Sequence, residues 1–113
     1  MDIIEKEIGS VSTIALGGRL DIYSSKDLEE KLNALVNSDK VCLVVSLEGL
    51  DYISSSGLRV LLAFLKEVKK REGDIKLACM KPSIKEVFDI AGFSQLFSIY
   101  DLESVAVQAF NKT

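Results

Sequence analysis

An abrupt change of hydrophobic period near the middle of the chain constrains its fold more strongly than any other feature. Residues 41–47 form a short apolar run rich in β-branched side chains, which is typical of a strand buried on both faces. From about residue 58 to residue 71, the apolar side chains instead recur at helical spacing. The positions on that helical face are Leu58, Leu61, Leu62, Leu65 and Val68. A strand followed by a helix is the unit of α/β folds, and residues 51–59 join the two at an edge where functional sites gather.

The first segments of the chain predict a pair of neighbouring strands. Residues 3–8 and 11–16 have strand character, and the two residues between them suit a tight turn. We therefore expect an antiparallel hairpin at the start of the sheet. Gly17 and Gly18 are expected to end the second strand, with residues 19–23 as a loop that leads into a helix.

An amphipathic helix is predicted after this loop. Ser24 or Ser25 is the expected N-cap, and Asp27 stands at capping-box distance from Ser24. The helix is expected to stop near residues 37–39. Its apolar stripe, which would cover one face of the sheet, consists of Leu28, Leu32, Leu35 and Val36.

The last third of the chain continues the alternation. Residues 75–80 predict a strand, and Pro82, the single proline, marks its end. Ser83 opens a capping box for a short helix. A short edge strand is expected around residues 96–99, and Asp101 is the expected N-cap of a final helix.

The resulting order of elements is β-β-α-β-α-β-α-β-α. It predicts one α/β sandwich domain over residues 1–113. The expected sheet is mixed, mostly parallel after its antiparallel start, with about five strands, about four helices and right-handed crossovers.

The composition excludes the commonest enzyme and metal-site types. The chain has no histidine, so a Ser-His-Asp triad and histidine-ligated metal motifs are impossible. Glycine-rich phosphate loops are also missing from the sequence. Cys42 and Cys79 are expected to be small buried residues in a reducing compartment, with a disulfide or a metal pair as the alternative. Two thiols could complete a four-ligand zinc site only with carboxylates. We therefore expect no catalytic residue, no metal and no cofactor.

Charge and hydropathy also narrow the partners. The formal net charge is -3, which provides no basic surface for nucleic acid. No apolar run approaches the roughly 20 residues that a membrane span needs, and the N-terminus lacks the pattern of a signal peptide. The expected location is the cytoplasm, without contact to nucleic acid or membrane.

Three consecutive serines, Ser54, Ser55 and Ser56, stand at the junction between strand and helix. One interpretation is helix capping, for which a single serine suffices, with Gly57 allowing a tight approach to the helix. A second is phosphorylation, because a helix N-terminus tolerates the charge of a phosphate and the surface shown to a partner would change. A third, a catalytic serine, would need Lys, Asp or Glu as its base. Val60 lies opposite the predicted core face and could belong to a contact surface.

Three stretches carry a resemblance to a known family. They are Gly-Arg-Leu-Asp at residues 18–21, the apolar strand and loop at residues 43–53, and Ser-Ser-Ser-Gly-Leu at residues 54–58. Together they resemble STAS-domain proteins, and specifically the bacterial anti-sigma factor antagonists, over nearly the whole chain. Ser54 stands where the family usually has Asp.

The resemblance implies a function in partner switching. Family members bind an anti-sigma factor that is also a serine kinase and thereby free a sigma factor. The kinase phosphorylates a serine that corresponds to Ser55 here, with Ser54 and Ser56 as the alternatives, and a PP2C-type phosphatase reverses the step. The implied partner surface consists of Asp21, Ser54, Ser56, Gly57, Arg59 and Val60. A STAS scaffold or accessory module without a phosphoswitch is the alternative, and a small α/β nucleotide-binding protein or enzyme is the third hypothesis.

Overall fold

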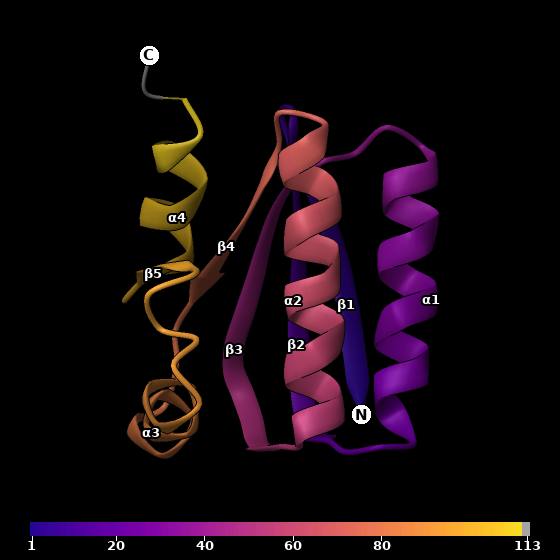
Figure 1. Cartoon of the computed structure of the whole chain (residues 1–113). Helices are drawn as coiled ribbons and strands as arrows, with labels where there is room; N and C mark the ends of the chain where they lie inside the picture. The colour runs from indigo at the N-terminus through magenta and orange to yellow at the C-terminus, as the bar shows by residue number, and fades with distance from the viewer. Residues whose placement is uncertain (112–113) are drawn as a thin grey trace.

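A computed structural model describes residues 1–111 and shows one five-stranded sheet carrying four helices (Figure 1). The elements are β1 (Asp2–Ile8), β2 (Val11–Leu20), α1 (Ser24–Asn37), β3 (Cys42–Ile53), α2 (Ser55–Lys70), β4 (Asp74–Ala78), α3 (Pro82–Ile90), β5 (Ser98–Tyr100) and α4 (Glu103–Ala109). The strands lie in the order β1-β2-β3-β4-β5. The pair β1/β2 is antiparallel and the other pairs are parallel. The predicted fold class and order of elements are confirmed.

The central strand β3 is buried on both faces, as its apolar run predicts. Leu43 and Val45 belong to the main core, to which α1, α2 and α3 contribute. Val44 belongs to a second, smaller cluster with Ala106 and Val107 of α4. In Figure 1, α1 and α2 lie side by side in front of the sheet, whereas α4 stands apart near the C-terminus.

Strands β2 and β3 are longer than predicted. The expectation that Gly17 and Gly18 end β2 is wrong, because the strand continues to Leu20 and pairs with β3 as far as Ile53. The register shifts next to each glycine, and Gly18 has a φ of 91°. The glycines therefore form an irregularity within the strand. Because both strands continue past it, they end side by side at one edge of the sheet.

Three predicted features of the later chain are also corrected. Pro82 is the first residue of α3, where its fixed φ suits a helix start, so Ser83 lies inside the first turn and makes no cap. The N-cap of α4 is Leu102 and not Asp101. Strand β4 ends before Cys79, whose φ of 60° breaks the extended conformation, and both cysteines are half-buried and free.

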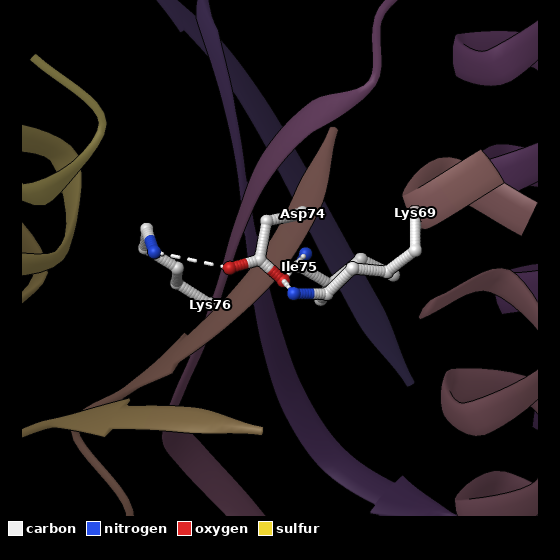
Figure 2. A network of polar contacts seen from close by, with 4 residues as sticks. All are labelled: Lys69, Asp74, Ile75 and Lys76. Carbon is white, nitrogen blue, oxygen red and sulfur yellow. Dashed lines mark hydrogen bonds and ion pairs between the residues drawn. The ribbon is translucent and has the colours of Figure 1, made fainter. Parts of the chain in front are cut away.

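A polar network at the start of β4 connects this strand to α2 (Figure 2). Asp74 lies between two lysines, with Lys76 Nζ at 3.0 Å and Lys69 Nζ of α2 at 3.4 Å from its carboxylate oxygens. Only 12% of the Lys76 side chain is exposed, and its Nζ lies 4.7 Å from the ring centre of Phe110, just after α4. The buried cation is thus paired with a carboxylate and an aromatic face, and it ties the C-terminal helix to the sheet.

Candidate functional site

The junction that the sequence singled out lies at the edge of the sheet where β2 and β3 end. Leu20 and Ile53 are paired residues, and the backbone N–H of Ser54 donates to the carbonyl oxygen of Leu20 at 2.8 Å. Helices α1 and α2 both begin at this edge and run in the same direction (Figure 1). The loop that holds Asp21 and the first turn of α2 are therefore neighbours.

The three serines have different roles in the first turn of α2. Ser54 is the N-cap, and its Oγ accepts a hydrogen bond from the N–H of Gly57 at 3.2 Å, so the capping interpretation holds for this residue. Ser55 is the first helical residue and is exposed. Ser56 is half-buried, and its Oγ lies 3.5 Å from a guanidinium nitrogen of Arg59. Only Ser55 combines exposure with a hydroxyl that neither caps the helix nor contacts Arg59.

Gly57 lets α2 approach β2 closely. A Cβ at this position would lie 2.6 Å from Cγ of Leu20 and 3.2 Å from a side-chain carbon of Ile53. Gly57 is itself buried, so it supports the predicted partner surface from below and does not form part of it.

The N-cap position of α1 is occupied by Tyr23, not by Ser24 or Ser25, and the side chain of Asp21 accepts hydrogen bonds from the backbone at this helix start. Its Oδ1 accepts hydrogen bonds from the N–H of Ser24 at 2.9 Å, from the N–H of Tyr23 at 3.0 Å and from the Ser24 hydroxyl at 3.0 Å. The Ser24 N–H is the main cause that lowers the pKa of Asp21 below its usual value, followed by the Ser24 hydroxyl. The predicted cap at Ser24 or Ser25 is wrong, because both serines lie inside α1 and Asp21 accepts the hydrogen bonds from the N–H groups of Tyr23 and Ser24.

A shallow groove of about 370 Å³ runs between α1 and α2 next to the junction. Its lining residues are Ile22, Ser25, Lys26 and Glu29 on the α1 side, and Ser56, Arg59, Val60 and Ala63 on α2. The structure thus brings together three residues of the predicted partner surface, Ser56, Arg59 and Val60. Asp21 and Ser54 lie at the edge from which both helices begin.

Two apolar residues at this edge were missed by the sequence analysis. Ile22 is 59% exposed and Tyr23 is 80% exposed, immediately after Asp21. Such exposure of large apolar side chains next to a groove is typical of a protein contact. The available signal was an isoleucine and a tyrosine in a segment predicted as a loop that leads into a helix.

Two charged side chains beside the junction, Asp51 and Arg19, have partners within the described chain. Asp51 pairs with Lys81 at 2.5 Å, and the guanidinium of Arg19 lies 4.2 Å from the ring centre of Tyr52. Within residues 1–111, no group of three or more His, Cys, Asp or Glu side chains could hold a metal ion.

The length and hydropathy of the helices bear on whether the protein could cross a membrane. None of those in the described part of the chain is long and apolar enough to cross a membrane.

Known proteins are similar to this chain in both sequence and fold. BtrV of Bordetella bronchiseptica, whose name assigns it provisionally to the anti-sigma factor antagonists, is 34% identical over 110 residues, which cover 97% of this chain and 95% of that protein. The anti-sigma-B factor antagonist of Bacillus subtilis is 33% identical over 86 residues, covering 76% of this chain and 78% of that protein.

Solved structures extend the comparison. The Bacillus anti-sigma factor antagonist SpoIIAA, in its unphosphorylated form, superimposes with a TM-score of 0.78 at 18% identity, covering 99% of this chain and all of that one. Its phosphorylated form gives a TM-score of 0.77 at 19% identity, covering 96% of this chain and 99% of that one. The STAS domain model matches residues 2–106. With this match and these relatives, the chain belongs to the STAS-domain family and, within it, to the anti-sigma factor antagonists.

Proposed function

We propose that this protein binds an anti-sigma factor that is also a serine kinase, and that phosphorylation of Ser55 switches this binding off. Binding would free a sigma factor in the bacterial cytoplasm, where transcription takes place, and a PP2C-type phosphatase would restore the binding form. The relatives named above are anti-sigma factor antagonists, and the fold neighbour SpoIIAA exists in a phosphorylated form. The protein itself would carry out no catalysis.

One observation carries the assignment of the switch. Ser55 is exposed at the first position of α2, beside the groove that Ser56, Arg59 and Val60 line. In the kinase reaction its Oγ would attack the γ-phosphorus of ATP, the bond to the β–γ bridging oxygen would break, ADP would leave and a base of the kinase would take the proton.

A phosphate at this position is compatible with the fold. The first turn of a helix has unpaired N–H groups and a positive dipole end, both of which favour an anion. A charge of about -1.5 to -2 would appear next to the partner surface, where it would repel acidic groups of the partner. The switch therefore acts on binding and leaves the domain folded.

The experiment combines the kinase with two substitutions. Incubation with the cognate anti-sigma kinase and ATP, followed by mass spectrometry, should locate one phosphate on Ser55. Ser55→Asp should weaken partner binding in a titration by about tenfold, which corresponds to about 1.4 kcal/mol, whereas Ser55→Ala should bind but accept no phosphate.

Ser104→Asp is the matched control, because Ser104 is an exposed serine in the first turn of α4, outside the groove. The Ser104→Asp variant should bind the partner with the same affinity as the parent protein. If Ser55→Asp bound as tightly as this control, or Ser55→Ala were phosphorylated like the parent, the switch would be refuted.

A STAS scaffold without a phosphoswitch is the second candidate. It is favoured by Ser54, which stands at the position where the family usually has Asp. Partner binding with no phosphate after incubation with the kinase would establish this alternative.

A further inference from the structure

Arg59 lies one helical turn after Ser55 on the same side of α2. Residues at positions i and i+4 of a helix are surface neighbours, about 5–6 Å apart between their Cβ atoms. Long side chains on a helix also point back toward its N-terminus. The guanidinium of Arg59 follows this direction, since one of its nitrogens lies 3.5 Å from Oγ of Ser56. The cation therefore lies over the turn that begins with Ser55.

Arg59 differs from the other two arginines in its partners. Arg71 lies 3.3 Å from a carboxylate oxygen of Glu67, and Arg19 lies over the ring of Tyr52. Within residues 1–111, none of the ion pairs involves Arg59, although Glu29 lines the same groove. Its only polar contact in the described chain is the long one to Ser56, so its charge is available to a stronger acceptor.

We propose that Arg59 pairs with the phosphate when Ser55 is phosphorylated, and that in the unphosphorylated protein it pairs with an acidic group of the partner. This inference rests on the proposed function of Ser55. A planar guanidinium can donate two parallel hydrogen bonds to phosphate oxygens, and such charge-assisted pairs are stronger than a contact to a hydroxyl. Phosphorylation then has two effects on the groove, because it adds an anion and withdraws the cation that the partner uses.

The first test needs no kinase. Phosphoserine is incorporated at position 55 during translation, and the second pKa of its phosphate is measured by a phosphorus NMR titration. An ordinary phosphoserine has a pKa of about 6. Pairing with Arg59 should lower it by about 0.5, the value expected for an exposed ion pair. Arg59→Gln should raise the pKa by the same amount, and Arg59→Lys should give an intermediate value.

Lys66→Gln is the matched control, because it removes one positive charge from an exposed position farther along α2. Its phosphate should titrate as in the parent. The inference is overturned if Arg59→Gln leaves the pKa unchanged, or if Lys66→Gln shifts it equally. Circular dichroism of each variant verifies that the domain is folded.

The second test uses the partner. Arg59→Gln should weaken binding of the unphosphorylated protein several-fold, and it should reduce the ratio of affinities between the unphosphorylated and phosphorylated forms. An unchanged ratio would overturn the inference. The two proposals can fail separately. If the kinase does not phosphorylate Ser55, the proposed switch is refuted. If Arg59→Gln does not change the pKa of the phosphate, the pairing with Arg59 is refuted.

Discussion

Replacing Gly57 with alanine tests how closely α2 must approach the sheet. The added Cβ would lie 2.6 Å from Cγ and 2.8 Å from Cδ2 of Leu20, well inside normal contact distance. Leu20 is fully buried, so its side chain cannot turn into solvent to make room. Helix α2 must therefore shift outward, which would also move the exposed residues of its first turn relative to Asp21.

Two opposing effects determine the magnitude. Overpacking of a core costs about 1–3 kcal/mol, and the better helix preference of alanine over glycine returns about 1 kcal/mol. We expect a net loss of about 1 kcal/mol in the free energy of unfolding. The free energy of unfolding of natural domains is about 5–15 kcal/mol, so a loss of this size should leave the variant folded.

Urea denaturation of a double-mutant cycle with Leu20→Ala is the assay. Leu20→Ala removes the two carbon atoms that meet the new Cβ, at a cost of about 2–5 kcal/mol by itself. In that background Gly57→Ala should be close to neutral, because of the three nearest atoms only the side-chain carbon of Ile53, at 3.2 Å, remains, and the gain in helix preference offsets this milder contact. The same destabilisation in both backgrounds would refute the assignment of the clash to Leu20. Partner binding should weaken in Gly57→Ala and recover in the double mutant.

Other substitutions test the cap, the acid dependence and the buried cation. Ser54→Ala should lower the free energy of unfolding by about 1 kcal/mol, whereas Ser54→Asp should keep the cap, as urea denaturation would measure. Asp21 has a lowered pKa when folded, so its carboxylate contributes stability above the ordinary value of 3.8 and loses it as the pH falls through the folded value. The stability difference between the parent and Asp21→Asn should therefore shrink in acid, and a difference independent of pH would contradict this. Lys76→Met should speed hydrogen exchange in α4, whereas Lys69→Gln, which removes a lysine with a side chain 58% exposed, should not.

Local patterns in the chain were sufficient for the order of elements. The apolar run at residues 41–47 and the helical spacing after Leu58 depend only on neighbouring residues, so they predict a strand and a helix correctly. The three serines predicted a helix cap in the same way, since the hydrogen bond of an N-cap joins residues three apart, but only the structure shows that Ser54 is the serine that caps. The family motifs then pointed to Ser55 as the acceptor, which remains a prediction.

Contacts between segments decided where several strands and helices begin and end. Gly17 and Gly18 look like the end of a strand, but contact with β3 continues the strand through them to Leu20. The start of α1 was misassigned because several neighbouring polar residues fit the local pattern, and only the folded loop shows that the N-cap position is Tyr23 and that Asp21 accepts from the N–H groups of Tyr23 and Ser24.

The groove between α1 and α2 was also beyond the sequence. Its two sides lie about 30 residues apart in the chain and meet only because both helices pack on the same face of the sheet. The sequence by itself determined the type and order of the strands and helices and the place of the serine junction, but not the residues at which several elements begin or end. Only the tertiary structure decided which of them face one another, because long-range strand register and helix packing depend on the whole core and not on neighbouring residues.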